Sequence, residues 1–389
     1  MKKRKIAVVT VARSDYGLLY PVIKRIKEAP ELKLQLLVTG MHLSPEFGNT
    51  VKIIEEEGFE ICEKVEMLLS SDAPSGIAKS MGLGTIGFAQ VYERIKPSLL
   101  LVLGDRFETH CAVVAAMPFR IPVAHIHGGE STEGAIDELI RHSITKMSHI
   151  HFPSTELYAK RIKRMGEESW RVFVSGAPGL DNIRMLEPLM SIEEFQEKYG
   201  IDLRFPTIMI TYHPVTLEYE NTSWQLQNLF AALKSVDQQL VFTYPNADTT
   251  GRLIVEMIND FAQERSGVHI RINLGQRGYL GLIKHSVAMV GNSSSGIIEA
   301  PSFELPVVNI GNRQKGRIRA RNVIDVGYPK DEILDGIKKA LSSEFKHSLK
   351  GLVNPYGDGN ASQIIVDVLK SIDIDDKLIL KKFNDSIIA

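Results

Sequence analysis

Short runs of Val, Ile and Leu recur along the chain, and stretches with apolar residues at helical spacing separate them. Strands that are buried on both faces of a parallel sheet require such continuous apolar runs, and crossover helices account for the stretches between them. The pattern therefore predicts parallel sheets built from βα units. The predicted strands comprise residues 5–11, 33–39, 98–104, 121–127, 207–213, 239–245, 287–293, 305–311 and 322–327.

The alternation of strands and helices stops at Gly179, and the segment from there to Pro206 has helical character and no strand pattern. A chain of 389 residues is also longer than one ordinary hydrophobic core supports. We therefore predict an α/β protein with two Rossmann-like, doubly wound domains, residues 1–185 and 186–365, that face one another across a cleft. Residues 366–389 are expected to form a closing helical segment that packs back on the N-terminal domain.

Composition and charge narrow the class of protein. Hydrophobic residues make up 44% of the chain and charged residues 24%, as is typical of a water-soluble globular protein. A net charge of −1 provides no basic field for nucleic acid or an anionic membrane, so neither is an expected partner. No apolar run approaches the roughly 20 residues of a membrane span. The cysteines, Cys62 and Cys111, are too few for a disulfide framework, and free thiols suit the cytoplasm.

Polar residues directly after the predicted strands are the first candidates for function, because ligands of open parallel sheets bind beyond the carboxyl ends of the strands. Such residues recur after several strands of the N-terminal half, where we expect contacts to a substrate. They are Arg13, Asp15, His42, Asp105, Arg106 and Glu108. The comparable residues of the second half are His213, Asn246, Asp248 and Arg313.

Residues 292–296, Asn-Ser-Ser-Ser-Gly, follow a predicted strand and precede a helical pattern. Hydroxyl and backbone N–H groups at a helix N-terminus bind phosphate, and a simple helix cap needs one serine rather than three. The run therefore predicts a phosphate site that includes Ser293 and Ser294. Glu299, on the first turns of that helix, is placed either to bind a ribose diol or to complement the helix dipole. Arg313 is either a partner for a diphosphate or an exposed cation.

The stretch AHIHGGESTEGAIDELIRH combines histidines, carboxylates and glycines just after a predicted strand. His125 and His127 are two apart on that strand and would share one face, which is also the spacing of paired metal ligands. Local spacing sets no third ligand and no cysteine lies nearby, which favours an acid/base loop over a metal site. Asp137 would then stand at the start of the following helix. Arg141 and His142, one turn later, are expected to be supporting groups.

These residue types describe a cleft enzyme that acts on a sugar nucleotide, with carboxylates in the first domain and a phosphate site in the second. Residue type and spacing leave glycosyl transfer, epimerisation and simple nucleotide binding all open.

Nearly the whole chain carries an ordered series of motifs, namely RSDYG, GMHLSPEFGNT, GDRFE, HIHGGESTEGAIDELIRHSITKMSH, HPVTLE, PNADT, GNSSSGIIEAPSF, NIGNRQKGR and NPYGDGNA. Together these motifs resemble the hydrolysing UDP-N-acetylglucosamine 2-epimerases that open sialic acid and legionaminic acid biosynthesis. Non-hydrolysing relatives typically have an Arg-Pro-Glu type of loop where this chain has Arg13, Ser14 and Asp15, which points away from simple reversible epimerisation. The resemblance implies a glycosyltransferase B arrangement with the substrate between the domains, no metal or nicotinamide cofactor, and a homodimer or homotetramer.

The resemblance also implies a reaction. A base removes the C2 proton of the sugar while the anomeric C–O bond breaks and UDP leaves, and water then adds to the resulting glycal to give the free 2-epimer. By motif position, Asp105 and Asp137 resemble the acid/base aspartates of the N-terminal domain. The groups that resemble the diphosphate contacts are Arg13 of the N-terminal domain and His213, Ser293, Ser294 and Arg313 of the C-terminal domain. Asn246 and Glu299 resemble the nucleoside end of the site. His213 is suited to protonating or hydrogen-bonding the leaving phosphate.

One position departs from the pattern of many relatives, which carry a glutamate in His-Ile-Glu-Gly-Gly where this chain has His127. An imidazole with an ordinary pKa of about 6.5 suits proton transfer, and its site directly follows the strand end. We therefore expect His127 to take the catalytic role, with Glu130 or Glu133 as the alternative.

The resemblance leaves two substrates. UDP-N-acetylglucosamine would give N-acetylmannosamine and UDP, and UDP-N,N'-diacetylbacillosamine would give 2,4-diacetamido-2,4,6-trideoxymannose. The discriminating contacts are loop side chains such as those of residues 68–76. A glycosyltransferase of the same architecture, which would keep the sugar linked in its product, and a sugar-nucleotide sensor without turnover are more distant alternatives.

Overall fold

The computed structural model describes residues 3–71, 73–131, 136–213, 215–244, 251–272 and 274–385. The chain divides into two compact units. The N-terminal unit comprises Met1–Asn182 and Tyr356–Ala389, and the C-terminal unit comprises Ile183–Pro355. The domain boundaries predicted from the sequence were residues 185 and 365.

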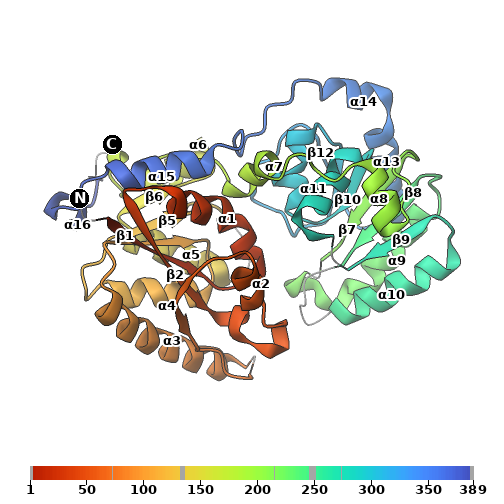
Figure 1. Ribbon diagram of the computed structural model, residues 1–389. Helices are drawn as coiled ribbons and strands as arrows, with labels where there is room; N and C mark the ends of the chain where they lie inside the picture. Colours follow the sequence, from red (N-terminus) through yellow and green to blue (C-terminus); the bar gives the residue numbers. More distant parts are fainter. Residues whose placement is uncertain are drawn as a thin grey trace. The chain divides into compact units, whose positions relative to one another are not determined.

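The N-terminal unit contains a six-stranded parallel sheet with strand order β3-β2-β1-β4-β5-β6, flanked by helices (Figure 1). The strands are β1 (Arg4–Thr10), β2 (Leu32–Thr39), β3 (Ile61–Val65), β4 (Leu99–Leu103), β5 (Val123–Ile126) and β6 (Ile150–Phe152). The helices are α1 (Arg13–Glu28), α2 (Val51–Glu56), α3 (Pro74–Ile95), α4 (Phe107–Ala116), α5 (Ile136–Met147), α6 (Glu156–Arg164), α15 (Ala361–Ser371) and α16 (Asp376–Ile379).

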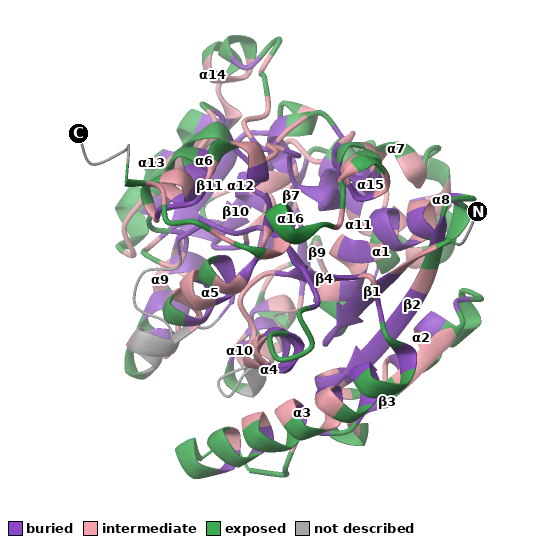
Figure 2. Cartoon of the chain, turned by 90° about the vertical axis from the view of Figure 1, so that its left-hand side faces the viewer, coloured by how far each residue is buried: buried purple, intermediate pink, exposed green. Residues whose placement is uncertain are grey.

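The continuous apolar run of β4 shows why this chain forms a covered parallel sheet. All five of its residues are buried, and they pack alternately into two hydrophobic layers. Leu99 and Leu101 face the layer that includes helix α1, whereas Leu100 and Val102 face the layer that includes helices α3 and α4. Figure 2 shows the strands as buried, while the outer side of α3 is exposed. Each such leucine contributes about 1.5–3 kcal/mol by leaving water.

The C-terminal unit repeats this architecture with strand order β12-β11-β10-β7-β8-β9, again all parallel. The strands are β7 (Thr207–Thr211), β8 (Gln239–Thr243), β9 (Val268–Arg271), β10 (Ala288–Gly291), β11 (Val307–Ile310) and β12 (Val323–Val326). The helices are α8 (Ile192–Tyr199), α9 (Thr222–Leu233), α10 (Gly251–Glu264), α11 (Gly275–His285), α12 (Ser295–Ile298), α13 (Lys330–Leu341) and α14 (Ser343–Ser348), and α7 (Asp181–Met185) spans the boundary between the units.

The two sheets therefore confirm the predicted doubly wound α/β class, and every predicted strand is present. The chain reverses direction across each sheet between β1 and β4 and between β7 and β10, and ligands of doubly wound sheets bind at this switch point. The sequence analysis missed three edge strands, β3, β6 and β9. β3 and β9 are partly exposed, so they lack the continuous apolar run. β6 is buried but has only three residues, too few for a recognisable pattern.

The end of the chain belongs to the N-terminal unit. Asp181 accepts hydrogen bonds from the backbone N–H groups of Ala361 (2.9 Å) and Ser362 (2.7 Å) and so caps α15. The prediction of a closing helix over residues 366–389 is wrong in extent, because α15 ends at Ser371 and the next helix, α16, has four residues. Of the helices that the structure describes, none combines the length and apolar composition that a membrane span requires.

Candidate functional site

The switch point of the N-terminal unit gathers candidate residues from two loops. Arg13 and Asp15 lie on the first turn of α1 after β1, and Asp105 and Arg106 lie between β4 and α4. The Nε atom of Arg106 is 3.9 Å from Oδ2 of Asp15, so the two loops meet. Burial raises the pKa of Asp15 to about 6, against the opposing charge of Arg106. This carboxyl group therefore titrates near neutral pH.

Asp105 forms an ion pair with a buried arginine that was predicted to be only a supporting group. Arg141 on α5 forms an ion pair with Asp105 and a second one with Glu138, whose Oε2 is 2.9 Å from Nη1. The Arg141 side chain is 3% exposed. Asp137 lies four residues before Arg141 and so shares its helix face. The structure thus brings both predicted aspartates to one side of α5.

The environment of Asp137 favours proton exchange. Burial raises the pKa of its carboxyl group, and the charge of Arg106 acts in the opposite direction. Because Arg106 also acts on Asp15, one guanidinium influences acid groups on α1 and α5. This is the arrangement expected of an acid/base site.

His127 does not share a face with His125, and that expectation is wrong. Strand β5 ends at Ile126, and His127 has a φ of 64°, which turns it out of the strand. Its Nδ1 lies 2.5 Å from Oε1 of Glu130, which also accepts a 2.7 Å hydrogen bond from Ser154. Within the described part of the chain, Nε2 of His127 is buried and has no hydrogen-bond partner. A positive φ is uncommon for a residue other than glycine, and here it occurs together with a buried imidazole nitrogen. The combination indicates a functional position.

Two further histidines of this unit, His125 and His42, support the site. His125 Nε2 is 2.8 Å from the carbonyl oxygen of Gly104, directly before Asp105, and burial lowers the pKa of His125 to about 3. His42 was expected to bind substrate, but it is fully buried and both of its ring nitrogens are hydrogen-bonded, to Thr10 and Thr50. His42 therefore holds the loop after β2, and its predicted substrate contact is corrected to a structural one.

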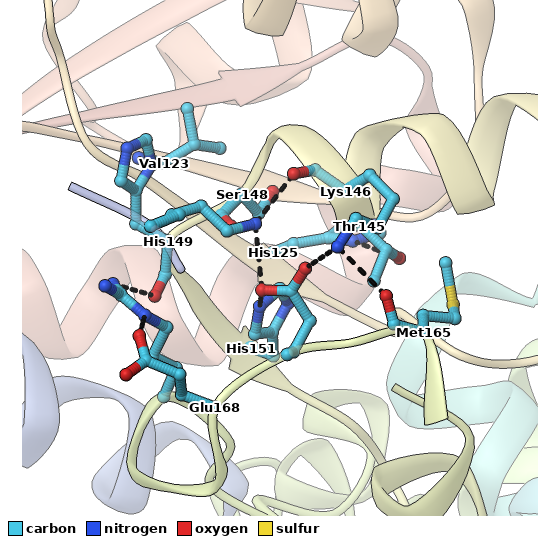
Figure 3. Close-up of polar contacts among 12 residues, drawn as sticks. Val123, His125, Thr145, Lys146, Ser148, His149, His151, Met165 and Glu168 are labelled. Carbon is cyan, nitrogen blue, oxygen red and sulfur yellow. Dashed lines mark hydrogen bonds and ion pairs between the residues drawn. The ribbon is translucent and has the colours of Figure 1, made fainter. Parts of the chain in front are cut away.

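A buried ionic cluster forms around Glu167 and includes Lys146 of α5 and His151 of β6, both labelled in Figure 3, and Lys381 near the C-terminus. The Glu167 side chain is 1% exposed and accepts from Lys146 (2.6 Å), Lys381 (2.8 Å) and His151 (3.1 Å). His151 pairs with His125 across β5 and β6. The cluster therefore links Lys381, near the C-terminus, to β6, which pairs with β5. His125 on β5 in turn contacts the loop that carries Asp105.

At the switch point of the C-terminal unit, Asn292 holds the ends of β7 and β10 together. Its Oδ1 accepts from the backbone N–H of His213 (2.7 Å), and its Nδ2 donates to the carbonyl oxygen of His213 (2.8 Å). Arg313 donates to the carbonyl oxygen of Asn292 (3.0 Å). The structure thus brings His213, Ser293 and Arg313 to one place, as the sequence predicted.

The donors in this region suit an anionic ligand. Burial lowers the pKa of His213 to about 3, and the charge of Arg313 adds to the effect. His213 is therefore a neutral imidazole at pH 7. Glu299 is not on the first turns of a long helix as expected, because α12 has only four residues, and Glu299 follows its last residue.

Tyr279 is a residue that the sequence analysis missed. It lies on α11, which follows the unrecognised strand β9. Burial raises the pKa of Tyr279 to about 12, and hydrogen bonds to Ser295, Ser293 and Thr211 oppose the shift. Its hydroxyl group therefore lies among the serines of the predicted phosphate site. Had β9 been recognised as a strand, the helix that follows it would have been inspected for candidate residues.

Three candidates, Asn246, Asp248 and Glu133, lie outside the described residues. Among the side chains that the structure does describe, no group of three or more His, Cys, Asp or Glu is arranged to hold a metal ion. The described residues offer acid/base groups in the N-terminal unit and phosphate donors in the C-terminal unit.

The contact between His127 and Glu130 predicts the effect of His127→Gln. The substitution removes a titratable ring, so we expect kcat to fall about tenfold to a hundredfold while UDP affinity changes little. Steady-state rates between pH 5 and 9, with UDP binding by calorimetry, measure both. His347→Gln, at an exposed histidine, is the matched control. An unaltered pH–rate profile would transfer the role to Glu130.

Comparisons with known proteins agree in family and fold. The sequence model of the UDP-N-acetylglucosamine 2-epimerase family matches residues 24–370. A Legionella pneumophila protein named UDP-N,N'-diacetylbacillosamine 2-epimerase (hydrolyzing) is 40% identical over 97% of this chain and 98% of its own length. A Campylobacter jejuni protein named GDP/UDP-N,N'-diacetylbacillosamine 2-epimerase (hydrolyzing) is 40% identical over 99% of this chain and 100% of its own. A solved UDP-GlcNAc 2-epimerase from Neisseria meningitidis, bound to UDP-GlcNAc, has a TM-score of 0.80 at 21% identity, covering 94% of this chain and 99% of that one.

Proposed function

Because this chain belongs to the UDP-N-acetylglucosamine 2-epimerase family, we propose that it is a hydrolysing 2-epimerase whose preferred substrate is UDP-N,N'-diacetylbacillosamine. The relatives from Legionella pneumophila and Campylobacter jejuni carry that substrate in their names. UDP-N-acetylglucosamine is the second candidate, because the family is named for it. For the reaction itself, the observation that carries the proposal is the ion pair of Asp105 with Arg141 on α5, the helix whose first turn also carries Asp137.

In the proposed reaction, one of the two aspartates takes the C2 proton of the sugar while the anomeric C–O bond breaks. The bonding electrons leave with the β-phosphate, and a C1–C2 double bond remains. Water then adds its hydroxyl group to C1, and a proton returns to C2 on the opposite face. Arg141 orients the Asp105 carboxylate by their ion pair, and burial raises the pKa of Asp137, which favours its role in proton transfer.

The leaving diphosphate requires donors, and the C-terminal unit supplies them. Ser293 and Ser294 present hydroxyl groups directly after β10, and Arg313 supplies a positive charge beside Asn292. Neutral His213 donates one hydrogen bond to a phosphate oxygen. These groups stabilise the negative charge that develops on the leaving oxygen.

We further propose that the protein acts as a cytoplasmic homodimer or homotetramer. The chain has two cysteines, Cys62 and Cys111, and both are free thiols in the structure. Light scattering of the purified protein tests the oligomeric state.

Parallel kinetics with both sugar nucleotides test the substrate assignment. We expect kcat/KM for UDP-N,N'-diacetylbacillosamine to exceed that for UDP-N-acetylglucosamine by at least about tenfold, the discrimination that a few pocket contacts supply. Chromatographic quantification of UDP and free sugar measures both rates. Faster release from UDP-N-acetylglucosamine would reassign the substrate. A product in which the sugar remains linked to an added acceptor would instead indicate a glycosyltransferase.

A further inference from the structure

Glu108, on the first turn of α4, has a carboxylate that points into the protein. Its side chain is 1% exposed and packs on Gly40, where an added Cβ would lie 3.0 Å from Oε1 and 3.2 Å from Cγ of Glu108. A glutamate that only complemented the helix dipole would not need burial, and Glu156 on the first turn of α6 is exposed. Burying a carboxylate costs free energy unless a partner compensates it. The burial of Glu108 therefore indicates a specific role for its carboxylate.

The partner of Glu108 is Arg106, which also faces Asp15. Nε of Arg106 is 3.6 Å from Oε2 of Glu108 and 3.9 Å from Oδ2 of Asp15. Its Nη2 lies 2.9 Å from Sδ of Met41. The guanidinium group is thus held between an inner carboxylate on α4 and an outer one on α1. The sequence placed Glu108 among the expected substrate contacts, but its side chain is 1% exposed and faces Arg106.

We propose that Glu108 is a positioning residue, which fixes Arg106 beside Asp15 so that the guanidinium charge acts on the acid/base carboxyl groups of the N-terminal unit. This inference rests on the proposed function and deepens it. Glu108 itself need not touch the substrate, because it acts through Arg106.

The electrostatics of the three carboxyl groups agree with this arrangement. Burial raises the pKa of Glu108, of Asp15 and of Asp137, and in each case the charge of Arg106 acts in the opposite direction. The charge of Glu108 additionally raises the pKa of Asp15. Arg106 and Glu108 therefore shift the proton equilibrium of Asp15 in opposite directions.

Two neighbouring titratable groups, His42 and Cys111, carry no charge at pH 7. Burial lowers the pKa of His42 to about 4 and raises that of Cys111 to about 11, so both are uncharged. The charged and titratable groups that face the pair are Asp15 on α1, His42 after β2, Cys111 on α4 and Asp137 on α5.

Shifts of the same sign in two variants test the proposal. Glu108→Gln keeps the shape of the side chain and removes the charge that holds Arg106, so the guanidinium group loses its place beside Asp15 and the inflection of the kcat/KM profile nearest pH 6 should move to higher pH. Loss of the Glu108 charge without movement of Arg106 would instead move this inflection to lower pH. Arg106→Met removes the charge that lowers all three carboxyl pKa values, so the same inflection should move to higher pH. Each shift is expected to be about half a pH unit or more. Glu156→Gln, at an exposed first-turn glutamate, should leave the profile unchanged.

A titration without turnover separates this inference from the proposed function. Carbon-13 NMR of protein labelled at the aspartate carboxyl groups reads the pKa of Asp15 in the wild type and in each variant, with Asp15→Asn used for assignment. Upward shifts of the Asp15 pKa in both variants support the positioning role even if wild-type protein releases no UDP, a result that would reject the proposed function alone. A downward shift in Glu108→Gln, or no shift, overturns the inference. If Glu108→Gln does not fold, an unmoved Asp15 signal in Arg106→Met overturns it by itself.

Discussion

Replacement of Asp105 or Asp137 by asparagine is expected to lower kcat about a hundredfold to ten-thousandfold, the range that a positioned acid or base supplies. Asparagine keeps the size of each side chain but neither accepts nor releases a proton. Asp105 also loses its ion pair with Arg141, which retains Glu138 as a partner. UDP affinity should stay within about threefold of wild type, because the predicted phosphate donors belong to the other unit.

Rates of UDP release and calorimetric binding of UDP measure both effects. The matched control is Asp376→Asn, because the Asp376 side chain is 84% exposed and forms only a surface ion pair with Arg120. Near-normal turnover in either the Asp105 or the Asp137 variant would remove that residue from the acid/base assignment. A matching loss of UDP affinity would mean that the substitution disturbs binding instead of chemistry.

The largest expected effect on stability belongs to Glu167→Gln. The carboxylate is buried and compensates the charges of Lys146 and Lys381 and the ring of His151. Removal of one member of a buried ionic cluster leaves uncompensated charge, which costs about 3–5 kcal/mol. We therefore expect the free energy of unfolding of the N-terminal unit to fall by about 3 kcal/mol or more.

The pH dependence of this effect follows from the pKa of Glu167. Burial alone would raise that pKa, but hydrogen bonds and charges from His151, Lys146 and Lys381 outweigh burial and hold it at about 2. The folded pKa lies below the unfolded value of 4.5, so the contribution is fully present above that value. It is lost as the pH falls through about 2, and the gap between wild type and variant should close there.

Urea unfolding followed by tryptophan fluorescence measures the loss. The chain has two tryptophans, and a Trp224→Phe background leaves Trp170, in the N-terminal unit, as the reporter. Glu55→Gln is the control, because Glu55 and Lys64 form an ion pair with both side chains 47% exposed and should contribute at most about 1 kcal/mol. Equal unfolding midpoints for Glu167→Gln and Glu55→Gln would contradict a stabilising role of the buried cluster.

The fold was predictable wherever burial is complete. Central strands such as β4 are apolar throughout, and no other local pattern accounts for such runs between helices. Three of the four edge strands escaped notice; in β3, Ile61–Val65, partial exposure admits polar residues such as Glu63 and Lys64. The closing helix was overestimated because charge alternation near the C-terminus does not specify a helix, and the segment is held by tertiary contacts to Glu167 and Arg171.

The sequence indicated where the candidate residues lie, but not which side chains contact one another. Placement after parallel strands was enough to select Asp105, Arg106 and His213. The partners of these residues come from tertiary structure, so the ion pair of Asp105 with Arg141 and the burial of Glu108 could not be read from spacing. The resemblance to the epimerase family, drawn from ordered motifs, is confirmed by the family match over residues 24–370.

Proton NMR of the purified enzyme with each UDP-sugar in deuterated water tests the central claim most directly. Elimination and rehydration predict free UDP together with a manno-configured free sugar that carries deuterium at C2, because the C2 proton is exchanged during the reaction. UDP that stays attached to an epimerised sugar, or a released sugar that retains its C2 proton, would contradict the hydrolysing 2-epimerase account.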